Sequence, residues 1–104
     1  MIIEMRTYTI QIGKFGQFAE YYAAHGLPPQ QRILGNLIGY FSSDIGALNQ
    51  AVQLWGYESY AERERRRAEL AKDPDWLNYL KTAPQVIVSQ ENRILLPTAF
   101  SPIK

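Results

Sequence analysis

The sequence predicts a single α+β domain, with an antiparallel sheet and helices gathered on one of its faces. Three observations predict it: strand-like runs near both ends and in the middle of the chain, amphipathic helical segments between these runs, and turn residues at the junctions. The expected order is strand, helix, strand, strand, helix, strand. A chain of 104 residues has room for one such unit, so we expect one domain over residues 1–104.

The first strand is expected from Ile2 to Ile10, because its side chains alternate in polarity. One face of this strand carries Glu4, Arg6 and Tyr8. The other face carries Ile3, Met5, Thr7 and Thr9. The segment is therefore predicted as a strand with one polar face.

The first helix is expected after Gly13, where apolar residues recur at helical spacing. These residues are Phe15, Phe18, Ala19 and Tyr22. The helix is predicted to reach about Ala24 and to stop at His25-Gly26. The paired prolines within residues 27–32 favour a connecting loop. A single helical turn that restarts through Ile33 and Leu34 is an alternative.

The middle of the chain predicts a hairpin followed by a helical region in two parts. Residues 36–43 and 50–57 are rich in β-branched and aromatic residues, which is typical of strands. Ser59 and Glu62 form a capping-box pattern at the start of a helix over about residues 60–72. Asp73 before Pro74 predicts the start of a further helix.

The last strand is expected in two pieces. Residues 86–88 and 92–96 are strand-like, and the polar residues 89–91 between them predict an interruption. Pro97 and Pro102 exclude further regular pairing in the tail.

This order is the split β-α-β arrangement of ferredoxin-like folds, with a four-stranded antiparallel sheet and both helices on one face. The helix-covered face should hold the apolar residues, so we expect the row of Glu4, Arg6 and Tyr8 on the uncovered face. Tyr40, Trp55 and Tyr57 would make that face too aromatic for ordinary surface. We therefore expect the sheet of a second copy to cover it.

The composition narrows the possible partners and cofactors. Eleven basic and ten acidic residues give a net charge of +1, which favours neither nucleic acid nor a membrane surface. The chain has no cysteine, one histidine and no glycine-rich phosphate loop, so we expect no metal and no cofactor. No run is long and apolar enough to span a membrane or to act as a signal peptide, and we expect a soluble, cytoplasmic protein.

Five segments resemble the NIPSNAP family: residues 3–9, 34–41, 48–57, 61–67 and 89–95. They span nearly the whole chain in the family's order. The resemblance implies the dimeric α/β-barrel architecture, in which two ferredoxin-like sheets pack face to face. One departure is Gln53, which stands where the family often has a histidine. The resemblance implies no defined biochemical activity.

The candidate ligand-binding residues come from the strand faces and from the end of the first helix. They are Glu4, Arg6, Tyr8, His25, Tyr40, Gln53, Trp55 and Tyr57. Arg6 could hold a carboxylate or enolate oxygen beside the phenol of Tyr8, or could form a buried ion pair with Glu4 that fixes the dimer. His25 could cap its helix or act as an acid or base. Arg63, Arg65, Arg66 and Arg67, interleaved with glutamates, are interpreted as a solvated, ion-paired face or a subunit contact.

Three functions follow from these patterns. The leading hypothesis is a family member without a defined reaction that binds a small aromatic ligand or a protein. It would act as a homodimeric barrel, and a higher oligomer is an alternative. The alternative is a cofactor-independent monooxygenase-like enzyme for a small aromatic or polyphenolic substrate, in which Arg6 and Tyr8 stabilise an enolate, Trp55 stacks on the ring, and His25 or Glu4 takes the proton. The third hypothesis treats the row of Glu4, Arg6 and Tyr8 as a dimer contact alone.

Overall fold

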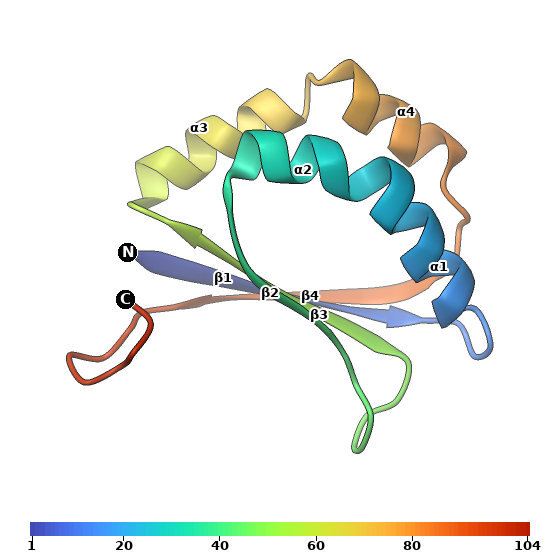
Figure 1. The fold of residues 1–104 in the computed structure, drawn as a ribbon, viewed down its shortest axis with the longest axis horizontal. Coiled ribbons are helices and arrows are strands. Elements are labelled where there is room, and N and C mark those ends of the chain that lie inside the picture. Colours follow the sequence, from blue (N-terminus) through green and yellow to red (C-terminus); the bar gives the residue numbers. More distant parts are fainter.

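Four antiparallel strands form one sheet, and the helices arch over one of its faces (Figure 1). The computed structural model describes residues 1–104. The strands are β1 (Ile2–Ile10), β2 (Asn36–Ser42), β3 (Gln50–Tyr57) and β4 (Ile87–Leu95), in the order β2-β3-β1-β4. The helical elements are α1 (Phe15–Tyr21), the π-helical turn η1 (Tyr22–Gly26), α2 (Leu27–Leu34), α3 (Tyr60–Leu70) and α4 (Pro74–Thr82). The predicted ferredoxin-like α+β fold is confirmed, and none of its helices has the length and apolarity needed to cross a membrane.

The predicted loop over residues 27–32 is wrong, because α2 occupies this segment. Pro28 and Pro29 fall in the first turn of α2, where a missing backbone N–H and a fixed φ cost little. The predicted stop at His25-Gly26 is wrong for a related reason. The backbone there widens into η1 and continues, and the turn with positive φ comes only at Gly35 (φ 88°).

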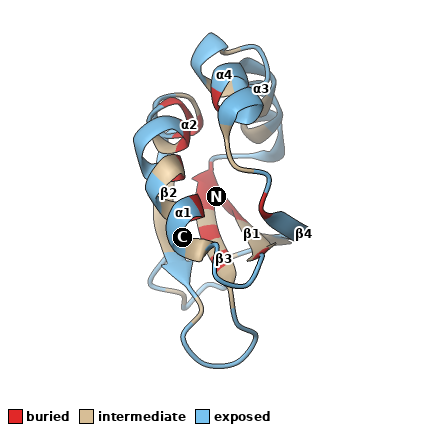
Figure 2. Ribbon diagram, turned by 90° about the vertical axis from the view of Figure 1, so that its right-hand side faces the viewer, coloured by how far each residue is buried: buried red, intermediate tan, exposed pale blue.

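The predicted interruption of the last strand is also wrong. β4 runs without a break through Ser89, Gln90 and Glu91, which pair with Thr9, Tyr8 and Thr7. The only shift in the β1–β4 register lies at the start of β4, between the partners of Thr9 and Ile10 of β1. As an edge strand, β4 is exposed along most of its length (Figure 2), so polar residues fit into it without a burial cost.

The second helical region begins with a side-chain cap, as predicted. Ser59 Oγ accepts a hydrogen bond of 3.1 Å from the backbone N–H of Glu62. The reciprocal half of the capping box is absent, because the Glu62 carboxylate binds Arg65 and Arg66 instead. Asp73 caps α4 in the same way, accepting from the N–H of Trp76 at 3.0 Å.

Replacing Ser59 with alanine is expected to lower the free energy of unfolding by about 1 kcal/mol, because one N–H at the start of α3 loses its acceptor. Urea denaturation would measure the change. Ser59→Thr keeps a hydroxyl acceptor and serves as the control. Equal midpoints for the alanine and threonine variants would contradict the role of the cap.

The assignment of the two sheet faces is the main error of the sequence-based prediction. Glu4, Arg6 and Tyr8 do not lie on the uncovered face but beneath the helices: Glu4 binds Arg63 of α3, and Tyr8 packs against the core around Tyr79 of α4. Trp55 and Tyr57 are buried on the same side. The prediction failed because α3 supplies a charged partner for Glu4, so a charged residue can occupy the covered face.

The uncovered face consequently carries the alternate side chains of β1, which are Ile3, Met5, Thr7 and Thr9. On this face Met5 stands opposite Leu54 of β3, Ile3 opposite Leu95 of β4, and Val52 of β3 opposite Thr7. The charges on it, Glu91 and Arg93, pair with each other at 3.1 Å. No element of this chain covers this face, which we call the open face (Figure 1).

Candidate functional site

A row of polar side chains crosses all four strands beneath the helices. Directly opposite residues share a face, and the register places Tyr40 of β2 beside Gln53 of β3, Gln53 beside Arg6 of β1, and Arg6 beside Asn92 of β4. We call these four residues the polar row. Glu4 and Tyr8 flank Arg6 on β1.

The polar row separates the core into two hydrophobic clusters. The first holds Ile10, Phe18, Tyr22, Ala51, Tyr79 and Val86, and the second holds Ile2, Leu34, Trp55, Tyr57 and Leu70. A helix-covered sheet face is usually apolar, because burying polar groups costs free energy. The polar row is therefore the first place to look for a function.

Glu4 is completely buried, and three donors converge on one of its two oxygens. Arg63 of α3 donates to Oε2 at 2.8 Å, Asn92 at 2.6 Å and Arg6 at 3.1 Å. Burial alone would raise the pKa of Glu4, but the hydrogen bonds from Arg63 and Asn92 and the charges of Arg6 and Arg63 outweigh it. The pKa of Glu4 is therefore below its usual value of 4.5, and Glu4 is ionised at neutral pH.

The lowered pKa of Glu4 predicts a loss of stability in acid. The stabilisation that ionised Glu4 contributes is fully present when the pH is above the pKa of Glu4 in the unfolded chain, near 4.5. It is lost as the pH falls through the lower pKa of Glu4 in the folded protein. Urea midpoints measured from pH 7 down to pH 3 should therefore fall for the wild type, and fall less for Glu4→Gln. Other acidic groups contribute equally to both proteins. Parallel curves for the two proteins would contradict the prediction.

The other half of the polar row is a chain of neutral hydrogen bonds. Trp55 Nε1 donates to Gln53 Oε1 at 2.6 Å, and Gln53 Nε2 donates to the hydroxyl of Tyr40 at 3.4 Å. The Tyr40 ring lies against that of Tyr22, with centroids 5.0 Å apart. Burial raises the pKa of Tyr40 and Tyr22 far above the usual value, and that of Tyr79 to about 12, so these phenols are neutral at physiological pH.

Arg6 is the member of the polar row best placed to meet a ligand. Its Nε donates to the Tyr8 hydroxyl at 3.1 Å and its Nη1 to Glu4, while its Nη2 makes no hydrogen bond within the protein. Its side chain is 14% exposed. Asn92 and Gln90, on the neighbouring edge strand, are exposed. Arg6 and Tyr8 thus keep donors free on the β4 side of the domain.

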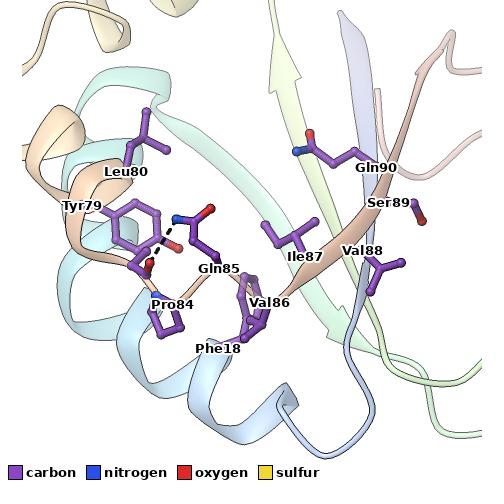
Figure 3. Close-up of a pocket in the computed structure, with 11 residues that line it drawn as sticks. Phe18, Tyr79, Leu80, Pro84, Gln85, Val86, Ile87, Val88, Ser89 and Gln90 are labelled. Carbon is purple, nitrogen blue, oxygen red and sulfur yellow. Dashed lines mark hydrogen bonds between the residues drawn. The ribbon is translucent and has the colours of Figure 1, made fainter.

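A cleft of about 530 Å³ lies on this same side, between the end of α4 and the start of β4 (Figure 3). Tyr79, Leu80 and Phe18 form its wall on the helices. Ile87 and Gln90 project toward the helices from β4. Gln90, which lines the cleft, stands directly opposite Tyr8 of β1.

The structure brings together most, but not all, of the residues singled out in the sequence. Glu4, Arg6, Tyr8, Tyr40 and Gln53 lie together beneath the helices. Trp55 and Tyr57 are on the same face but fully enclosed in the second hydrophobic cluster. His25 does not join them: it is exposed on η1, with its ring 4.6 Å from that of Tyr21.

Sequence reasoning missed Arg63 and Asn92, which complete the environment of Glu4, and Gln90, which borders the cleft. Arg63 was placed on a solvated face, yet α3 turns it inward. The spacing of Arg63, Arg67 and the apolar Leu70 along one helical stripe could have indicated this. No three acidic or histidine side chains lie close enough together to hold a metal ion.

A family model described as NIPSNAP matches residues 3–102. A NipSnap homolog from Dictyostelium discoideum is 33% identical over 94 residues, which are 90% of this chain and 41% of the relative. The human NipSnap homolog 3A is 38% identical over 68 residues, 65% of this chain and 28% of the relative. The chain thus spans less than half the length of either relative.

Solved structures give the same family. A NIPSNAP family protein from Agrobacterium tumefaciens has 46% identity and a TM-score of 0.95 over 99% of this chain and 98% of that one. A second from the same organism, described as of unknown function, has 38% identity and a TM-score of 0.96 over 100% and 94% of the two chains. A putative antibiotic biosynthesis monooxygenase from Nitrosomonas europaea shares the fold alone, with 10% identity and a TM-score of 0.65 over 93% and 98%.

Proposed function

The chain belongs to the NIPSNAP family, and we propose that in this family member the cleft beside β4 binds a small aromatic ligand, whose polar end is held by Arg6 and Tyr8. One observation carries the proposal. The helix-covered face holds the polar row, although packing alone would favour apolar residues there. Free hydrogen-bond donors of this face lie near an open cleft.

The chemistry of the cleft sets the ligand class. Tyr79, Leu80 and Ile87 offer flat apolar surface for an aromatic ring. The guanidinium of Arg6 and the hydroxyl of Tyr8 would donate to a carboxylate or phenolate oxygen at the other end. The amides of Gln90 and Asn92 add polar groups along the edge strand.

We propose that the protein forms a homodimer through the open face. Met5, Val52 and Leu54 are only half-buried in a single chain, and Leu95 is 40% exposed. A second copy would cover the exposed parts of these apolar side chains, as the second sheet of a barrel does. The cleft lies on the opposite face of the sheet, so both protomers would keep it accessible.

An enzymatic alternative, a monooxygenase acting without a cofactor, has only the shared fold in its favour, and a fold does not define an activity. Trp55 could not stack on a substrate ring, because it is fully buried and its Nε1 is bonded to Gln53. His25 lies outside the site, and Glu4 is held by three donors. No residue arrangement in the cleft favours catalysis over binding.

The binding proposal is tested by calorimetric titration with salicylate, benzoate and catechol. We expect at least one of these compounds to bind, and Ile87→Trp, which fills the cleft, to abolish binding. Ile12→Trp is the matched control, because Ile12 is 88% exposed in a turn outside the cleft. If no compound binds at millimolar concentration, or if Ile87→Trp leaves binding unchanged, the cleft is not the ligand site.

A further inference from the structure

A second groove opens beside β2, at the edge of the sheet opposite to β4. Phe15, Phe18 and Tyr22 line it from the first helical stretch, and Leu37 and Tyr40 line it from the strand. Figure 2 shows β2 beside α1 and α2 on one side of the domain, and β4 on the other. We call this space the β2 groove. It is reached from the opposite edge of the sheet to the cleft beside β4.

The β2 groove contains no charge. No charged residue lines it, and Ser42 is its only lining residue that is neither aliphatic nor aromatic. Burial raises the pKa of Tyr22 and Tyr40 far above the usual value, so both phenols are neutral. The Tyr22 hydroxyl already donates to Gln30 Oε1. An ion in this groove would lose water without gaining a partner, so an occupant must be neutral and largely apolar.

A series of aromatic rings forms one wall of the β2 groove. The ring centroids of Phe15 and Phe18 are 5.9 Å apart, and those of Phe18 and Tyr22 are 6.0 Å apart with nearly parallel planes. Tyr40 extends the series to β2, with its centroid 5.0 Å from that of Tyr22. Aromatic rings gain additional stabilisation from further aromatic partners at such distances. The wall therefore favours an aromatic occupant over an aliphatic one.

Small side chains keep the β2 groove open on its helical side. Ala19 and Ala23 line it four residues apart, which places them one above the other on the helix. Between them the helix widens from α1 into η1, which begins at Tyr22. Widened turns of this kind often occur at functional sites. A larger residue at either alanine would fill part of the groove.

We propose that the β2 groove is a second ligand site, which binds a small neutral molecule with an aromatic ring. Its volume of about 330 Å³ suits one such molecule, because ligand pockets begin at roughly 300 Å³ whereas packed interiors rarely leave spaces larger than a water molecule. Phe18 is the one residue that lines both this groove and the cleft beside β4 (Figure 3). The proposal does not depend on the anionic ligand proposed for that cleft.

An NMR titration of the isotope-labelled protein with benzyl alcohol tests the proposal. We expect the methyl resonances of Ala19, Ala23 and Leu27, which line the groove, to shift together and saturate. Benzoate has the same ring but carries a charge, so its affinity measured at these methyl groups should be at least about tenfold lower. Shifts that benzoate causes at the Ile87 methyl groups report on the cleft beside β4, so the failure of either site can be distinguished.

Variants locate the binding in the β2 groove. Ala23→Phe places a ring in the groove and should abolish the binding of benzyl alcohol. Ala24→Phe is the matched control, because the neighbouring Ala24 is exposed and does not line the groove. Ile87→Trp, which fills the cleft beside β4, should leave the binding of benzyl alcohol unchanged.

Several results would overturn the proposal. One is the absence of shifts in the three methyl groups with benzyl alcohol in the millimolar range, or equal affinity for benzoate at these groups. Another is an Ala23→Phe variant that binds benzyl alcohol like the wild type. Tighter binding of hexanol would show that the groove selects aliphatic chains. A change of the mass in solution in Ala23→Phe alone would show that the groove is a contact between copies of this chain.

Discussion

Replacing Glu4 with alanine is expected to lower the free energy of unfolding by about 3–5 kcal/mol. The carboxylate is completely buried and is the shared acceptor for Arg6, Arg63 and Asn92. Without it, two guanidinium groups stay in the interior with no buried counter-charge, and the penalty for desolvating them is no longer offset. Urea denaturation at pH 7 measures the loss.

Two further variants keep this prediction testable if the alanine variant fails to fold. Glu4→Gln retains an acceptor oxygen without the charge and should lose less stability. Glu4→Leu combined with Arg63→Leu removes a charge pair together, and should be more stable than Glu4→Leu alone. A loss below about 1 kcal/mol in the alanine variant would show that the ion-pair cluster contributes little.

Replacing Leu54 with lysine is expected to convert the proposed homodimer into monomers. Leu54 lies at the centre of the open face, directly opposite Met5 of β1. Two copies packed through this face would each bury about 800 Å² in an interface of ordinary size, and a buried, unpaired lysine at its centre would oppose association. Light scattering after gel filtration would give a mass of 12.0 kDa for the variant and twice that for the wild type.

Ala68→Lys is the control for this change, because it adds the same side chain to an exposed position of α3. It should leave the dimer intact. A wild-type protein that is monomeric at every concentration, or a Leu54→Lys variant that remains dimeric, would contradict association through the open face.

The ranges of the strands could be predicted from local pattern, but the covered face of the sheet could not. Alternation along Ile2–Ile10 shows that the two faces differ, without showing which one the helices cover. Polarity normally decides this question. Here it misleads, because Arg63, 59 positions away in the sequence, supplies the charge partner that allows Glu4 to be buried.

The candidate site, like the fold, could be predicted only where its residues follow one another along a single strand. Glu4, Arg6 and Tyr8 were identified because they follow one another on one strand face. Asn92 was missed because only the pairing of β4 with β1 brings it to Glu4. His25 was singled out for its side chain alone, and the continuation of the helix through η1 leaves it on the surface. Long-range pairing, rather than local pattern, decides which polar residues meet.

The function proposed for the polar groups beneath the helices is to bind a small ligand from the cleft beside β4. Its most direct test is an NMR titration of the isotope-labelled protein with salicylate, observing the side-chain N–H groups of Arg6, Gln90 and Asn92. We expect these resonances to shift together and saturate, while the backbone resonances of Met5 and Leu54 on the open face change little. Shifts confined to the open face, or none in the three side chains at saturating concentration, would contradict it.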